Sequence, residues 1–251
     1  MAVGQALLLN EEAVVIQLTP CLKRGVTLMF GFCMKGVLFD LDGVIADTAV
    51  FHFAAWRKLV RDHFQAELPD ELEEKTKGVS REDSLKVILD YLQLTVSDEE
   101  FAALAAEKNE AYVDTLEDLK PAHILPGIAD LISDFKQAGL KLGLASASKN
   151  GPIILDKLGL ADAFDAIADP AKVAQGKPAP DIFLAAAAAL NLQPADCVGL
   201  EDSVAGVTAI NAAGMVSIGI GGAELAHASE RFESTSDLSY PAIEAAWQAN
   251  R

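Results

Sequence analysis

The stretch Met34–Thr48 constrains the fold of this chain more than any other part of it. Residues 36–39 are apolar or small and predict a short buried strand, which Asp40, Asp42 and Gly43 follow directly. Side chains at i and i+2 of a strand start on the same face, so the two carboxylates can address one point while glycine turns the backbone around it. Two neighbouring anions require a cation. Since Mg²⁺ prefers oxygen ligands and completes its shell with water and phosphate, the stretch predicts a site for Mg²⁺ and a phosphoryl group.

The second half of the chain alternates helical and strand patterns. The predicted helices are 127–138, 152–158, 181–190 and 204–213, and the predicted strands are 140–145, 164–168, 197–200 and 216–220. A last strand is expected at 230–236 and a closing helix at 240–248. This alternation predicts an α/β fold, a Rossmann-like parallel sheet with helices on both faces and ligands at the carboxyl ends of the strands.

An all-helical segment interrupts this pattern directly after the first strand. Amphipathic helices are expected from residue 49 onward and at 68–77, 80–91 and 97–116, where Ser97 and Glu100 form a capping-box pattern. The predicted organisation is an α/β core domain at 34–49 and 120–251, an inserted helical cap domain at 50–119, and an N-terminal extension of unknown role at 1–33. The cap is expected to lie over the carboxyl edge of the sheet.

The extension at 1–33 carries no chemical signature. Short strands at 14–18 and 26–32 would make a hairpin, and a protein that truly starts at Met34 is an equal alternative. The segment has no basic region ahead of an apolar stretch, which argues against a signal peptide, and the apolar run at 25–34 is too short to cross a bilayer.

Charge and cysteine usage limit the partners and the compartment. The 251 residues are 51% apolar and carry a formal net charge of −17, so they can fill a real core but would not attract nucleic acid or an anionic membrane. The three cysteines are widely spaced and match no metal-ligand pattern. We expect a cytoplasmic monomer that acts on small molecules, with local lysines and arginines making any phosphate site.

Three further clusters follow predicted strands or precede predicted helices. Ser146 lies in a loop of small residues that offers a hydroxyl and open backbone amides to an anion, or only caps a helix. Lys177 stands in a loop with two prolines, where it is either held in place or solvated. Glu201 and Asp202 end a strand, where they complete a Mg²⁺ shell or cap the next helix.

Taken together, the four clusters have the order, placement and residue types of the four motifs of the haloacid dehalogenase superfamily of phosphotransferases, which residues 34 to about 222 resemble. The resemblance implies that Asp40 is the nucleophile, that Asp42 is the general acid and base, and that Ser146 and Lys177 contact the transferring phosphate. It also implies one Mg²⁺ on four groups: Asp40, the backbone carbonyl of Asp42, Glu201 and Asp202.

The helical insertion and two longer motifs resemble a branch of that superfamily, the β-phosphoglucomutases, which interconvert β-D-glucose 1-phosphate and glucose 6-phosphate. The motifs are Ala-Ser-Ala-Ser-Lys-Asn-Gly-Pro at 145–152 and Gly-Leu-Glu-Asp-Ser at 199–203. The resemblance implies that His52 and Lys108 couple cap closure to the working state of Asp42. A second phosphate would contact Arg81, Ser148, Lys149 and Asn150. The remaining expected substrate-binding residues are Thr48, Trp56, Gly78, Ser80, Ser84 and Ala147.

A physical argument also favours a mutase. A mutase passes through a bisphosphate, here β-glucose 1,6-bisphosphate as the activating intermediate, and must hold a phosphate at each end of the sugar. Cations in both the insertion (Arg81) and the core (Lys149) meet that need. The main alternative is a sugar-phosphate phosphatase of the same superfamily. A non-catalytic phosphosugar-binding protein is disfavoured by the two aspartates, and phosphonatase chemistry would need a desolvated Lys108.

Overall fold

The computed structural model describes residues 33–251, and residues 34–251 form one compact unit. The two strands expected at 14–18 and 26–32 lie outside the described residues. Among the described helices, none is long and apolar enough to cross a membrane.

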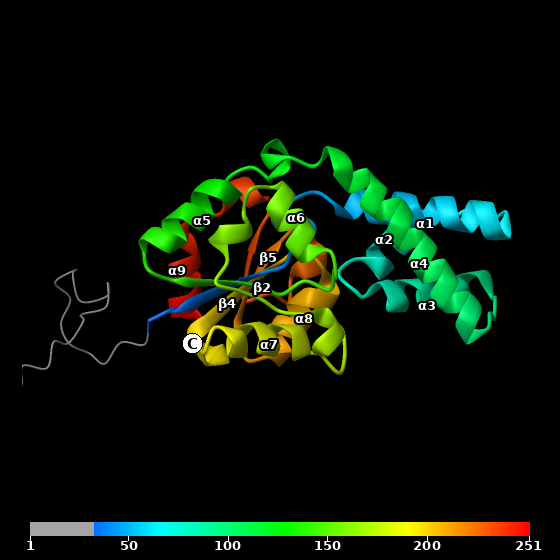
Figure 1. Cartoon of the computed structure of the whole chain (residues 1–251). Helices are drawn as coiled ribbons and strands as arrows, with labels where there is room; N and C mark the ends of the chain where they lie inside the picture. Colours follow the sequence, from blue (N-terminus) through cyan, green and yellow to red (C-terminus); the bar gives the residue numbers. More distant parts are fainter. Residues whose placement is uncertain (1–32) are drawn as a thin grey trace, which may run out of the picture. The chain divides into compact units, whose positions relative to one another are not determined.

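The described strands form one parallel sheet in the order β3-β2-β1-β4-β5-β6 (Figure 1). Their bounds are β1 Gly36–Phe39, β2 Lys141–Leu144, β3 Ala166–Ile167, β4 Cys197–Glu201, β5 Val216–Ile220 and β6 Glu230–Phe232. From the central β1 the chain builds the sheet outward through β2 and β3 on one side and then through β4 to β6 on the other. The order therefore reverses next to β1, the place where ligands bind in open α/β sheets.

Helices cover both faces of the sheet, as predicted. The helices are α5 Ile128–Gln137, α6 Gly151–Lys157, α7 Asp181–Ala189, α8 Val204–Ala212 and α9 Tyr240–Ala249. Alternate residues of β1 serve the two faces: Val37 and Phe39 pack in the apolar cluster that contains α5, α6 and α9, while Leu38 packs in the cluster with α7 and α8. Figure 1 shows α5 and α9 on one side of the strands and α7 on the other. The fold class expected from the sequence is confirmed.

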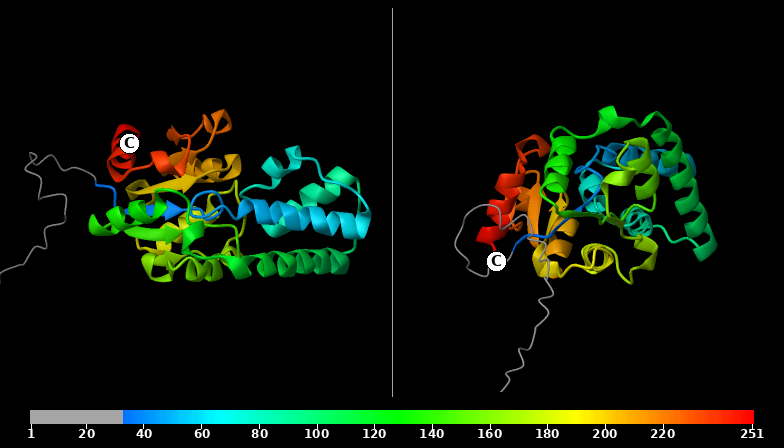
Figure 2. Two further views of the ribbon diagram at one scale, coloured as in Figure 1. Left: turned by 90° about the horizontal axis from the view of Figure 1, so that it is seen from above. Right: turned by 60° about the vertical axis from the view of Figure 1, so that its left-hand side comes forward.

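The insertion after β1 is helical and has its own apolar core. Its helices are α1 Ala49–Phe64, α2 Glu71–Thr76, α3 Arg81–Leu92 and α4 Asp98–Thr115. They share a buried cluster that includes Trp56, Leu72 and Ile88 and is separate from the two clusters of the sheet. In the left view of Figure 2 these cyan to green helices extend from one end of the sheet. The Ser97 hydroxyl accepts a hydrogen bond from the Glu100 amide, as the capping pattern predicts.

Three elements fall well short of the lengths that the sequence suggests. Strands β3 and β6 replace the longer strands expected at 164–168 and 230–236, and both are edge strands with a partner on one side only. After β6 the chain enters a 3₁₀ turn at Thr235–Asp237, in which the Ser234 amide donates to the Asp237 carboxylate. Helix α2 begins at Glu71, not at residue 68. Pro69 disfavours a helical backbone at Leu68, and the carbonyl of Leu68 accepts a hydrogen bond from Arg57 and not from an amide of the helix.

We expect the aromatic contact under the sheet to contribute strongly to stability. Phe135 of α5 is fully buried and meets Phe39 edge to face, with ring centroids 6.2 Å apart. Phe135→Ala should lower the free energy of unfolding by about 3–5 kcal/mol, measured by urea denaturation. The control Tyr91→Ala, at a side chain that is 51% exposed, should change it by less than about 0.5 kcal/mol. Equal effects of the two substitutions would contradict this account of the core.

Candidate active site

Three buried carboxylates gather where β1 and β4 end. Asp40 follows β1, Glu201 is the last residue of β4, and Asp202 comes next. The two strands are paired in register, so their ends coincide, and the ligand atoms of the three residues all lie within 4.8 Å of one another. Burial and then Glu201 raise the pKa of Asp202 to about 7, and burial also raises the pKa of Asp40. The raised pKa values show that the buried carboxylates lack enough positive charge around them, and a hard divalent cation with oxygen ligands would supply it.

Lys177 is the cation built into this cluster. Its Nζ lies 2.6 Å from Asp40 Oδ1 and 2.6 Å from Glu201 Oε1, with the side chain fully buried. Although burial opposes the charged form, the two carboxylates raise the pKa of Lys177 above its ordinary value. The lysine therefore stays protonated and holds the two carboxylates at a fixed separation.

The turn after β1 separates the two aspartates. Gly43 has φ +75° and packs so closely on Asp202 that an added Cβ would lie 1.6 Å from its Oδ2. Asp42 is already part of this turn, so its carboxylate leaves the acidic cluster: Oδ1 accepts a hydrogen bond from Thr48, and Oδ2 lies 3.8 Å from His52 Nε2. The i, i+2 geometry expected of a strand does not hold at Asp42, and only Asp40 points into the cluster.

A histidine and a lysine from the insertion lie behind Asp42. The Nζ of Lys108 is 2.6 Å from His52 Nδ1, and it lies 4.9 Å from the ring centre of Trp56. When this ammonium donates to Nδ1, the ring proton of His52 sits on Nε2 and faces Asp42. Burial and then Arg81 lower the pKa of Lys108 to about 7, and burial and then Lys108 lower the pKa of His52. The protonation of His52 and Lys108 next to Asp42 therefore depends mainly on how well these two side chains are shielded from water.

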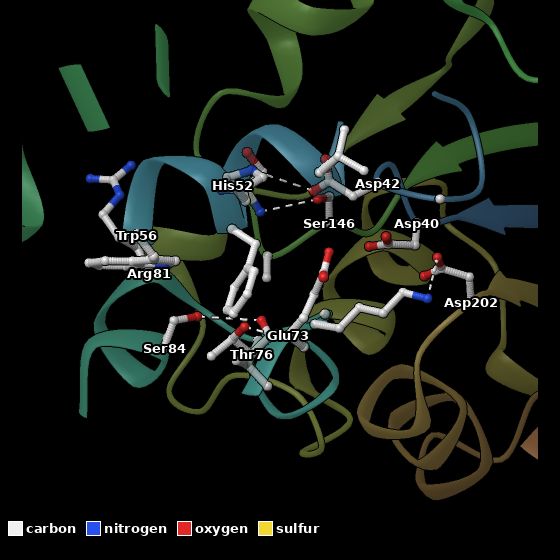
Figure 3. A pocket seen from close by; sticks show the side chains of 18 of the residues that line it. Asp40, Asp42, His52, Trp56, Glu73, Thr76, Arg81, Ser84, Ser146 and Asp202 are labelled. Carbon is white, nitrogen blue, oxygen red and sulfur yellow. Dashed lines mark hydrogen bonds and ion pairs between the residues drawn. The ribbon is translucent and has the colours of Figure 1, made fainter. Parts of the chain in front are cut away.

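These groups border a cavity of about 220 Å³ between the sheet edge and the insertion. Of the residues expected from the sequence, it is lined by Asp40, Asp42, His52, Trp56, Gly78, Arg81, Ser84, Lys108, Ser146, Ala147, Ser148, Lys149 and Asp202. Figure 3 shows several of them, with Asp40 and Arg81 on opposite sides of the view. The structure thus brings most of the predicted residues to one space.

The other expected residues do not line this cavity. Thr48 and Glu201 hold Asp42 and Lys177 in place, and the side chain of Asn150 bonds to a neighbouring asparagine. Ser80 and Lys177 line an adjacent cavity of about 210 Å³. The Ser80 hydroxyl caps α3, accepting from the Asp83 amide and donating to its carboxylate at 2.6 Å.

The residues expected around a second phosphate are joined across the insertion and the sheet edge. The amide oxygen of Asn109 accepts hydrogen bonds from Arg81 at 2.7 Å and from Asn150 at 3.0 Å. Beside them, Lys149 Nζ lies 2.7 Å from Glu82 Oε1. Cations from α3 and from the loop after β2 therefore meet at one side of the cavity, as a second anion site requires.

Sequence reasoning missed several residues of this region. Asn109 connects Arg81 to Asn150, and Lys77 forms an ion pair with Asp202 at 3.0 Å. Glu73 and Thr76 of α2 line the cavity. Asn109 follows Lys108 and Lys77 precedes Gly78, so both adjoin selected residues, but only the packing of the insertion on the sheet edge shows their partners.

A buried acidic cluster with its own lysine lies near a separate carboxylate, Asp42, and a second group of cations. This arrangement is typical of an enzyme site for transfer of a phosphoryl group. The family model described as haloacid dehalogenase-like hydrolase matches residues 34–214, and the chain belongs to this family. The resemblance expected from the four motifs is confirmed.

This chain aligns with individual relatives over nearly their whole length. The β-phosphoglucomutase of Bacillus subtilis (strain 168) is 43% identical over 223 residues, which are 87% of this chain and 97% of the relative. A crystal structure of β-phosphoglucomutase from Clostridium difficile has a TM-score of 0.84 and 42% identity, covering 86% of this chain and 98% of the other. The fructose-1-phosphate phosphatase of Escherichia coli (strain K12) is 32% identical over 185 residues, 74% of this chain and 95% of the relative.

Binding of Mg²⁺ to the acidic cluster should stabilise the protein. A ligand that binds only the folded state at a hundred times its Kd adds about 2.7 kcal/mol, which corresponds to a rise in Tm of roughly 5–10 °C. Asp202→Asn should abolish most of this rise, measured by thermal unfolding with and without Mg²⁺. The control Asp47→Asn removes an acid that borders the cavity outside the cluster and should retain the rise. An unchanged rise in Asp202→Asn would refute the assignment.

The buried Lys108 should make stability depend on pH. Its pKa is about 7 in the folded protein against an ordinary value of 10.5, so the folded state pays for the charge below pH 7 and is relieved as the pH rises toward 10.5. Lys108→Met should therefore raise the free energy of unfolding at pH 6, by about 1–3 kcal/mol, and the gain should shrink by pH 9.5. Urea unfolding across this range measures it. A gain that is independent of pH would contradict the prediction, and exposed Lys58→Met serves as the control.

Proposed function

We propose that this chain is a β-phosphoglucomutase, an isomerase that interconverts β-D-glucose 1-phosphate and glucose 6-phosphate. The observation that carries the proposal is a second group of cations at the cavity: Arg81, on the opposite side of the view from Asp40 in Figure 3, and Lys149, which lines the same cavity. A phosphatase needs one phosphate site, whereas a mutase needs two. The B. subtilis relative of that name, similar over almost its entire length, supports the same choice.

In the half-reaction that forms the aspartyl-phosphate, Asp40 attacks the phosphorus of one phosphate of the bound bisphosphate, and the other phosphate stays on the sugar. Its carboxylate oxygen forms a bond to phosphorus while the bond from phosphorus to the sugar oxygen breaks, which leaves an aspartyl-phosphate. Lys177, 2.6 Å from Asp40, acts against the effect of burial by favouring the ionised carboxylate, and it offsets the charge of the incoming phosphate. Ser146 borders the cavity next to it and supplies a hydroxyl to the same phosphate.

Asp42 handles the proton. It donates a proton to the leaving sugar oxygen and later removes one from the hydroxyl that attacks the aspartyl-phosphate, so the two half-reactions return it to its starting state. Thr48 fixes one of its oxygens, and His52 faces the other. Burial raises the pKa of Asp42, which favours the protonated form that can donate to the leaving sugar oxygen.

The intermediate is a sugar with a phosphate at each end. Arg81, Lys149, Ser148 and Asn150 hold whichever phosphate is not reacting, and β-glucose 1,6-bisphosphate must turn end for end between the half-reactions. The same cavity then presents either the C1 or the C6 oxygen to Asp42. This requirement also explains why trace bisphosphate activates such an enzyme, since it supplies the phosphorylated Asp40.

The acidic cluster of Asp40, Glu201 and Asp202 fits one Mg²⁺, which these residues and the backbone carbonyl of Asp42 would hold. When bound, the ion neutralises phosphate oxygens during transfer. We further propose that residues 50–119 act as a cap domain that closes on the core at 34–49 and 120–251 and excludes water from the aspartyl-phosphate. A monomeric state and a cytoplasmic location stay predictions.

The test is an incubation of the protein with Mg²⁺, β-glucose 1-phosphate and a trace of β-glucose 1,6-bisphosphate. Glucose 6-phosphate and free phosphate are followed together. Fast formation of glucose 6-phosphate with little phosphate, and no turnover of the α anomer, is the expected result. Stoichiometric release of phosphate without isomer would make the protein a phosphatase, as the E. coli relative is, and would overturn the proposal.

Two variants separate the roles of the two phosphate sites. Asp40→Asn should abolish the phosphoenzyme, because the amide is a poor nucleophile. Arg81→Ala should lower mutase turnover by about 100-fold while phosphoenzyme formation changes by less than about threefold, since Arg81 serves the phosphate that is not transferred. Arg61→Ala, at an exposed arginine of α1 that pairs with Glu67 and does not border the cavity, is the matched control. Equal losses in both assays for Arg81→Ala would contradict the two-site model.

A further inference from the structure

One carboxylate of the cavity has no part in the mechanism. Glu73 and Thr76 lie one turn apart on α2, so they share a helix face, and both line the cavity. In the view of Figure 3, Glu73 lies between Arg81 and Asp40. Within residues 33–251, the half-buried Glu73 carboxylate makes no hydrogen bond or ion pair. It is thus an acceptor without a partner in the space that the substrate enters.

Contacts on both sides keep α2 in this position. Leu72 is buried in the apolar cluster of the insertion. At the other end, Lys77 pairs with Asp202 at 3.0 Å, and Gly78 packs so closely on Ser203 that an added Cβ would lie 2.2 Å from its Oγ. Because these contacts anchor the chain on both sides of Glu73, they fix the helix face that carries its side chain toward the cavity.

The surroundings of Glu73 exclude an anion or a metal as its ligand. A phosphate would be repelled by the carboxylate and already has the cations of the two phosphate sites. Within the described chain, the group that could hold a metal ion is Asp40, Glu201 and Asp202, without Glu73. What the middle of a sugar phosphate offers is hydroxyl donors, and a carboxylate accepts up to four hydrogen bonds. The Thr76 hydroxyl donates to the carbonyls of Leu72 and Glu73, so its lone pairs are also left to accept.

The end-for-end turn of the intermediate narrows the choice of hydroxyl. A half-turn of a hexopyranose that exchanges C1 with the carbon bearing C6 also exchanges C2 with C4, while C3 keeps its place. An acceptor midway between the two phosphate sites can therefore bind the C3 hydroxyl in both orientations, but any other ring hydroxyl in only one. A hydrogen bond to the C3 hydroxyl is therefore the ring contact that can stabilise the transition states of both half-reactions.

We propose that Glu73, supported by Thr76, accepts a hydrogen bond from the C3 hydroxyl of the sugar and makes the enzyme select the configuration at that carbon. This inference rests on the proposed function, because the two-orientation argument applies to a mutase. It names a specificity-determining residue outside the phosphate and metal sites. A buried acceptor left unpaired by the wrong isomer disfavours that isomer.

The experiment compares β-D-glucose 1-phosphate with its C3 epimer, β-D-allose 1-phosphate, in wild type, Glu73→Ala and Glu73→Gln. For Glu73→Ala we expect kcat/KM with the glucose substrate to fall at least about 30-fold and the glucose-to-allose preference to fall at least about tenfold. Glu73→Gln keeps an acceptor oxygen and should restore part of the preference. Phosphoenzyme formation from acetyl phosphate, which has no ring, should change less than about twofold.

The matched control is Glu71→Ala, which removes an exposed carboxylate of the same helix that does not border the cavity. Equal losses for both sugars in Glu73→Ala, or the same preference change in Glu71→Ala, would overturn the proposal. If wild type releases phosphate without isomer, the proposed mutase activity fails. The same sugar pair, followed by phosphate release, then still decides whether Glu73 selects the configuration at C3.

Discussion

The bridge that Lys177 makes between Asp40 and Glu201 is the interaction on which the site depends. Parallel pairing of β1 and β4 brings the two carboxylates to one edge of the sheet, where burial penalises their charge. Without a buried cation, the strand ends would carry uncompensated charge, which costs several kcal/mol per ion. One ammonium at 2.6 Å from each carboxylate makes the arrangement tolerable while leaving Asp202 and further oxygen atoms for a metal. The sheet thus supports the site by holding the segments that carry Asp40, Lys177 and Asp202 at fixed separations.

Two aspartates two residues apart acquire different chemistry because the turn at Gly43 sends them to different surroundings. Asp40 stays with the acidic cluster and its lysine, whereas Asp42 turns toward Thr48 and the histidine of α1. The proposed nucleophile, Asp40, and the proposed proton donor, Asp42, need opposite protonation states at the same pH, and separate environments are how one fold provides both. The division depends on a glycine, since a side chain at that position would collide with Asp202.

Much of this organisation was predictable from the sequence. Apolar runs marked the strands, and since parallel strands end at one edge, clusters such as Glu201 and Asp202 were expected near Asp40. The resemblance to a family, not the pattern itself, supplied the expected roles. The short edge strands and the true start of α2 were missed because single-sided pairing and Pro69 decided them. Contacts such as Lys77 with Asp202 or Asn109 with Arg81 join segments whose meeting depends on how the insertion packs, which no local pattern encodes.

The single amide oxygen of Asn109 holds donors from two parts of the molecule, Arg81 of α3 and Asn150 of the loop after β2. These donors are already assembled on one oxygen, so a phosphate that arrives at the proposed second site would exchange one acceptor for another. Little reorganisation remains to be done at the moment of binding, and the free energy of the encounter is available for orienting the sugar. The oxygen of Asn109 thus occupies the acceptor position that we propose for a phosphate oxygen, and the internal hydrogen bonds hold both donors in the geometry that this phosphate would need.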